Sequence, residues 1–109
     1  MKTSELSGAA LDWAVAKCEG WIDDCNGWLY QATIQEVEDG HYKPSTDWAQ
    51  GGPIISREGI TLRCGLHGWD AELPEFRVLV DGANALEAAM RCYVASKLGD
   101  EVTIPEGVK

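Results

Sequence analysis

The chain has 109 residues, 45% of them hydrophobic, and a formal net charge of −9 from 18 acidic and 9 basic residues. This length and composition predict a single globular domain over residues 1–109, with one modest core. The negative charge repels duplex DNA, RNA and anionic membranes, so it disfavours them as partners. A small phosphate ligand stays open, because salt screens a distant field over about 8–10 Å and a few nearby arginines can outweigh it.

The cysteines give no sign of a metal or redox motif. Cys18, Cys25, Cys64 and Cys92 form no C-x-x-C pair. The chain also starts without a basic-then-apolar signal segment, and no apolar run is long enough to span a bilayer. We therefore expect reduced thiols in the cytosol, no metal and no cofactor.

The first half of the chain predicts a helix, a strand and a second helix. Apolar spacing indicates a helix from Thr3 or Ser4 to a stop at Gly20. In that helix Asp12 is either a buried polar anchor or an exposed residue, and we favour the anchor because large apolar residues flank it. Alternation predicts a strand from Trp28 to Val37. The second helix is expected from Thr46 to about Glu58, broken or tightened at its Gly-Gly-Pro run.

The second half predicts a small sheet and a closing helix. Ile60 to about Leu66 and Trp69 to Leu73 alternate like strands around a hairpin turn at His67-Gly68. The stretch from Phe76 to Val80 is either a further strand or an apolar connector, and Asp81-Gly82 is expected to turn. The last helix should run from Ala85 to Leu98, because Asn84-x-x-Glu87 is a capping box and Gly99 suits a helix end.

These elements predict an α+β fold. An amphipathic antiparallel sheet needs its apolar face covered, and the first and last helices can cover it. We expect a compact sandwich of three to four antiparallel strands, with the N-terminal and C-terminal helices packed on the sheet and a short central helix.

The stretch from Tyr42 to Ile55 holds the most unusual local chemistry. Ser45, Thr46 or Asp47 can cap a helix, and Trp48 follows directly. Free N–H groups and the helix dipole favour an anion at such a helix start. Plain capping is the commoner role of these residues, so both interpretations stay open.

We predict a ligand site built around this stretch. Trp48 or Trp69 could stack on a base, although large aromatic side chains are more often core. One of Arg57, Arg63 and Arg91 could hold a phosphate, or each could pair with the surplus carboxylates. The predicted ligand-binding residues are Tyr42, Ser45, Thr46, Asp47, Trp48, Gln50, Arg57, Trp69 and Arg91.

Two further features bear on function. Five tryptophans exceed what so small a core can bury, so we expect one or two at a pocket rim or at the interface of a homo-oligomer. His41 and His67 lie in predicted loops, and the sequence fixes no nucleophile or carboxylate beside them. We therefore predict no catalytic residues.

Three phrases of the sequence together resemble one family. They run from Ser4 to Ala16 (SELSGAALDWAVA), from Pro44 to Ile55 (PSTDWAQGGPII) and from Ala88 to Asp100 (AAMRCYVASKLGD). In this order they resemble the phage NinX-like proteins, a family of bacteriophage and prophage products. The wider pattern is similar to the phage α/β/α-sandwich domain. The resemblance covers nearly the whole chain and is weakest from Arg63 to Ala83.

The resemblance implies a phage accessory protein that acts in the cytoplasm of the infected bacterial host, in host takeover or counter-defence. Three functions stay open. The first is a non-enzymatic module that sequesters a small anionic, nucleotide-derived immune signal. The second is an acidic inhibitor that docks on a basic host protein. The third is a small enzyme, which we rank last because no nucleophile elbow or P-loop is present.

Overall fold

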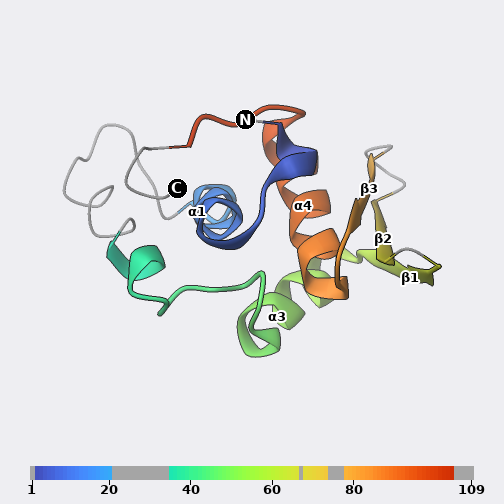
Figure 1. The fold of residues 1–109 in the computed structure, drawn as a ribbon, viewed down its shortest axis with the longest axis horizontal. Coiled ribbons are helices and arrows are strands. Elements are labelled where there is room, and N and C mark those ends of the chain that lie inside the picture. The colour runs from blue at the N-terminus through green and yellow to red at the C-terminus, as the bar shows by residue number, and fades with distance from the viewer. Residues whose placement is uncertain (1, 21–34, 67, 74–77, 105–109) are drawn as a thin grey trace.

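The computed structural model describes residues 2–20, 35–66, 68–73 and 78–104 (Figure 1). A short 3₁₀ helix, η1, comes first, and residues 35–38 are helical. The named elements, in chain order, are η1 (Thr3–Glu5), α1 (Gly8–Cys18), α3 (Trp48–Glu58), β1 (Thr61–Gly65), β2 (Gly68–Leu73), β3 (Val78–Gly82) and α4 (Ala85–Leu98).

The three strands form an antiparallel sheet in the order β1-β2-β3. Gly65 pairs with Gly68, so the predicted hairpin is confirmed, but Gly68 belongs to β2 and not to the turn, where it was predicted. Of the two interpretations of the third segment, the strand is correct. The expected turn at Asp81-Gly82 is wrong, because Asp81 pairs with Asp70 and Gly82 with Trp69. The chain bends two residues later, at residues 83–84, immediately before α4.

Helix α4 lies between the sheet and α1 (Figure 1). Its buried residues are Ala85, Leu86, Ala88, Ala89, Met90, Cys92, Tyr93 and Val94. Three of these residues are alanines, whose small side chains let neighbouring elements approach closely. The approach of β3 to α4 is close enough that a Cβ added to Gly82 would lie only 2.5 Å from the Ala88 nitrogen. The α+β class is confirmed. The expected packing of both terminal helices on the sheet is wrong for the first one, because α4 covers the sheet and α1 packs on α4.

The strand predicted from Trp28 to Val37 can be compared with the structure only at its end. Residues 28–34 lie outside the described part of the chain. Residues 35–38 are helical, so the prediction of a strand up to Val37 is wrong there. Gln and Glu are good helix formers, and the Gln35 side chain donates to Asp39 Oδ1 at 2.8 Å, one helical turn away. Val37 is still buried, which explains its apolar character.

Helix α3 begins two residues later than predicted. Asp47 is its N-cap, and its Oδ1 accepts the Ala49 N–H at 3.0 Å. The helix continues through the Gly-Gly-Pro run and ends at Gly59, whose φ of 70° is left-handed. Its buried residues are Gly51 and Ile54. Helix α4 begins and ends where predicted, with the Asn84 side chain accepting the Glu87 N–H.

No helix among the described residues is long and apolar enough to cross a bilayer.

Two adjacent glycines of α3 make a matched test of this packing. A Cβ on Gly51 would meet the Pro44 carbonyl oxygen and lie 2.7 Å from Leu86 Cδ2, whereas one on Gly52 would meet only the Trp48 ring at 3.8 Å. We expect Gly51→Ala to lower the free energy of unfolding by about 1–3 kcal/mol, because the Pro44 backbone cannot move aside as a flexible side chain could. Gly52→Ala should raise it by up to about 1 kcal/mol through helix propensity.

Urea denaturation measures both changes. Equal effects of the two substitutions, or a more stable Gly51→Ala variant, would contradict the close approach of α3 to Pro44.

Candidate functional site

A buried carboxylate ties the predicted site segment to α1. Asp12 is 5% exposed, and its Oδ1 accepts the Ser45 N–H at 2.9 Å. Burial raises the pKa of Asp12, and its bonds with Ser45 offset part of that rise. The expected polar anchor is therefore confirmed. Ser45 itself is only 3% exposed and is turned to the interior.

Gln50 fastens the same segment to the first turn of α3. Its Nε2 donates to the His41 carbonyl oxygen at 2.9 Å and to Asp47 Oδ2 at 3.3 Å. Its Oε1 accepts the Lys43 N–H at 2.7 Å. A single side chain thus satisfies backbone groups on both sides of Tyr42, so Gln50 has a clear structural role.

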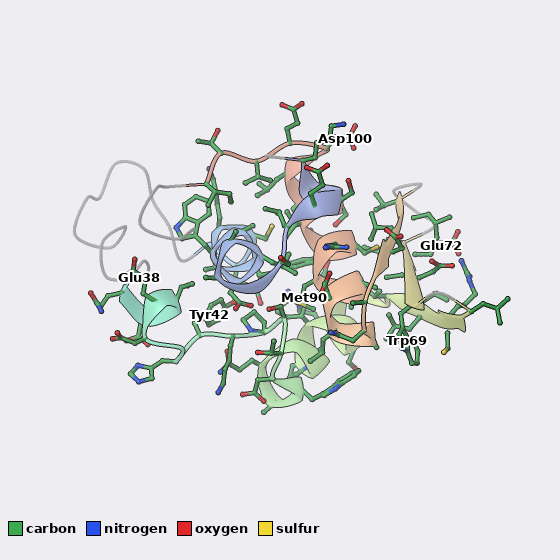
Figure 2. All side chains as sticks on the ribbon, viewed as in Figure 1. Glu38, Tyr42, Trp69, Glu72, Met90 and Asp100 are labelled. Carbon is green, nitrogen blue, oxygen red and sulfur yellow. The ribbon has the colours of Figure 1, made fainter. Side chains whose placement is uncertain are left out.

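Beside the Gln50 side chain is a hollow of about 350 Å³. It lies next to the C-terminal end of α1, the helical residues 35–38 and the start of α3. Its described lining residues are Glu19, Glu36, His41, Tyr42, Gln50 and Ile54. Figure 2 shows Tyr42 on the segment between the helical residues 35–38 and α3, below α1. The structure therefore brings two predicted site residues, Tyr42 and Gln50, to one hollow.

The described lining of the hollow is acidic. Glu36 lies 3.6 Å from His41 Nδ1, and both side chains are largely exposed. Burial would raise the pKa of Glu19, but hydrogen bonds from Arg57 and Tyr93 outweigh burial and hold that pKa below its usual value. Two carboxylates thus face this space, which differs from the phosphate-binding recess expected from the sequence.

Arg57 is held by protein acceptors. Its guanidinium donates to both oxygens of Glu19 at 3.1 and 2.8 Å, and its Nε donates to Glu58 at 2.8 Å. It also donates to the Tyr93 hydroxyl at 3.1 Å and lies 5.7 Å from the centre of that ring. The Tyr93 hydroxyl in turn donates to Glu19 at 2.9 Å. These residues join α1, α3 and α4 through charged hydrogen bonds.

Arg91 and Arg63 are also bonded to acceptors of the protein itself. Arg91 donates to the carbonyl oxygens of Leu6 at 2.7 Å and Asp81 at 2.9 Å, and it pairs with Glu87 at 2.6 Å. Arg63 pairs with Glu72 across the sheet at 3.1 Å. Of the two roles left open for these arginines, the structure therefore shows pairing with protein acceptors.

The remaining predicted residues lie apart from the hollow. Thr46 is exposed, Asp47 caps α3, and Trp48 is 57% exposed on the first turn of that helix. Trp69 lines a second hollow of about 220 Å³ at the hairpin end of the sheet, with Gly65, Leu66, Gly68, Asp70 and Asp81. A ligand role for each of these residues stays a prediction.

Two lining carboxylates were missed from the sequence. Glu19 follows the last residue of α1, and Glu36 lies in the stretch that was predicted as a strand. No local motif marks either residue. The indirect signal was Tyr93 on the apolar side of the last helix, because a buried phenol needs a hydrogen-bond partner.

Neither buried Cys92 nor the described metal-binding side chains add a reactive group or a metal site. Burial raises the pKa of the Cys92 thiol to about 11, so it fills space as an unreactive group. Among the described residues, no three His, Cys, Asp or Glu side chains are grouped closely enough to hold a metal ion.

One comparison decides the family. A family model described as Bacteriophage P22, NinX matches residues 2–97. The chain belongs to this phage family. The match spans α1, α3, the sheet and nearly all of α4, so the resemblance noted in the three sequence phrases is confirmed. The sequence matches no curated protein.

Glu19 gives a pH-dependent prediction. Its pKa in the folded protein is below the ordinary value of 4.5, so its contribution to stability is present above that pH and is lost as the pH falls further. We expect Glu19→Gln to lower the free energy of unfolding at pH 7 by about 1 kcal/mol, since the half-exposed Arg57 is screened. The deficit should shrink below pH 4.5.

Glu36→Gln is the matched control, because the Glu36–His41 pair is exposed and should contribute little. Denaturation curves between pH 3 and pH 7 measure both variants. A Glu19→Gln deficit that stays constant over this range would rule out the charged hydrogen bonds as its source.

Proposed function

We propose that the protein is a phage accessory protein that acts by binding, without catalysis, in the cytoplasm of the infected bacterium. In host takeover or counter-defence its target would be a host protein with a basic surface. Membership of the phage family supports the setting. The character of the binding surface rests on the charges around the hollow.

The observation that carries this proposal is the acidic hollow, together with arginines that are already paired with acceptors of the protein. Glu19 and Glu36 line the hollow, and the nearest predicted cation, Arg57, is already bonded to Glu19 and Glu58. A net charge of −9 adds a long-range field of the same sign. Lysine or arginine side chains of a partner fit this surface, and opposite charge speeds and orients docking.

Trp48 offers an apolar anchor outside the hollow. It is 57% exposed and lies on the same helical turn as Gln50, which lines the hollow. Tryptophan is enriched among the residues that dominate binding energy at protein interfaces. An exposed indole on the helix that also lines the acidic hollow suits a partner that presents both apolar and basic groups.

A second candidate is the sequestration of a small anionic, nucleotide-derived immune signal. The observation in its favour is the hollow itself, whose volume of about 350 Å³ is large enough for a small ligand. Tyr42 and Gln50, both predicted from the sequence, lie in it, and a carboxylate can accept hydrogen bonds from ribose hydroxyls. Bound phosphates would need a cation, and Arg57 could serve as one only by leaving Glu19.

Capture from host lysate tests the first candidate. Immobilised protein should retain a host protein at low salt and lose it as salt rises, because charge carries the docking. Trp48→Ala should weaken capture about tenfold or more, as expected for an interface anchor. Leu79→Ala is the control, since Leu79 is 60% exposed but lies on β3.

Thermal unfolding with cyclic dinucleotides and ADP-ribose derivatives separates the two candidates. A ligand at one hundred times its dissociation constant stabilises a protein by about 2.7 kcal/mol. We expect no shift. A clear rise in the unfolding temperature, together with host-protein capture that changes neither with salt nor in Trp48→Ala, would refute the basic partner. It would favour binding of the nucleotide signal.

A further inference from the structure

Strand β1 is an open edge of the sheet. The strand order places it at one side, and Thr61, Arg63, Cys64 and Gly65 are exposed while Leu62 is half-buried. In the described part of the chain, no backbone hydrogen bond reaches β1 from the side opposite β2. Figure 1 shows β1 at the outer end of the molecule, away from α1.

The other edge strand, β3, is better covered. It packs against α4, and Arg91 donates to the Asp81 carbonyl oxygen at 2.9 Å. The two edges are therefore not equivalent, and β1 is the edge that offers unpaired backbone groups. An exposed edge of this kind is a template for a further strand.

The register of the hairpin shows which backbone N–H and C=O groups of β1 point to the open edge. Gly65 pairs with Gly68, and only two residues separate them. In an antiparallel ladder, residues alternate between those bonded to one neighbouring strand and those facing the other. Leu62 and Cys64 therefore turn their N–H and C=O groups to the open edge, while their side chains lie on the α4 side of the sheet.

The charges on and around β1 bear on which strand can pair with this edge. The segment Thr61–Gly65 contains one cation, Arg63, and no carboxylate, in a chain with 18 acidic residues. The neighbouring strands carry Asp70, Glu72 and Asp81 on the outer face. Two copies with a net charge of −9 repel each other, and that repulsion is least where carboxylates are absent.

We propose that two copies of this chain pair through β1, antiparallel about a two-fold axis at Leu62. In this register Leu62 faces its own equivalent on the α4 side. Cys64 faces Ile60, the buried residue before β1, whose carbonyl oxygen can accept the Cys64 N–H while its own N–H stays bonded to the Ile55 carbonyl oxygen. Thr61 faces Arg63 on the outer face. Within β1 the pairing joins residues 61–63 of the two copies, makes a continuous six-stranded sheet, and sets no carboxylate opposite another.

Disulfide trapping tests this register. Leu62→Cys in a Cys64→Ser background should form a covalent dimer under mild oxidation, because paired strands bring the two Cα atoms to about 5.5 Å, a distance that a disulfide spans. Leu79→Cys in the same background is the control, since Leu79 is exposed on β3. Equal trapping at the two positions, or none at residue 62, would overturn the proposal.

Sedimentation of the unmodified chain supplies the second measurement, which needs no change to half-buried Leu62. We expect a dimer whose dissociation constant rises about tenfold in Arg63→Glu, because two carboxylates then enter the interface. Lys43→Glu makes the same change of charge on an exposed loop residue and should leave the dimer intact. A monomer at all concentrations, or a dimer insensitive to Arg63→Glu, would refute β1 pairing, and an extended peptide from another protein would then fit this edge.

Discussion

The hydrogen bond from the Ser45 N–H to the buried Asp12 carboxylate joins two segments that lie 33 residues apart in the chain. A carboxylate that is 5% exposed loses most of its hydration, so the interior tolerates it only with a well-placed donor. That requirement fixes the loop before α3 against α1. Asp47 then caps α3, and Gln50 fastens the loop to its first turn. The walls of the hollow follow from these contacts.

The charges that hold the helices together also set the character of the hollow. Glu19 receives hydrogen bonds from Arg57 and Tyr93 and so connects the end of α1 with α3 and α4. Because Arg57 serves this connection, it contributes little free positive charge to the hollow, where Glu19 and Glu36 remain. These charges support the proposal of a basic partner, because Arg57 could bind an anionic ligand only by giving up its bonds to Glu19.

Local signals predicted the fold well where they were unambiguous and failed where three-dimensional contacts decide. Helix α4 has one cap and one stop, and both its bounds were correct. Before α3 stand three possible caps, Ser45, Thr46 and Asp47. Propensity cannot choose among them, whereas Asp12 draws Ser45 inward and leaves Asp47 as the cap. The partners of Arg57 and Arg91 lie up to 38 and 85 residues away, so spacing could not reveal them. Asp81 and Gly82 look like a turn, but their pairing with β2 extends the strand.

Amide hydrogen exchange at Ser45 tests most directly whether Asp12 organises this region. The wild-type Ser45 amide should be protected about as strongly as the buried amides of α4. Asp12→Asn keeps an acceptor oxygen and should keep most of this protection. Asp12→Ala removes the acceptor and should speed exchange at Ser45 and Gln50 about tenfold or more, while α4 stays protected. Fast exchange at Ser45 in the wild-type protein, or exchange unchanged in Asp12→Ala, would contradict the account.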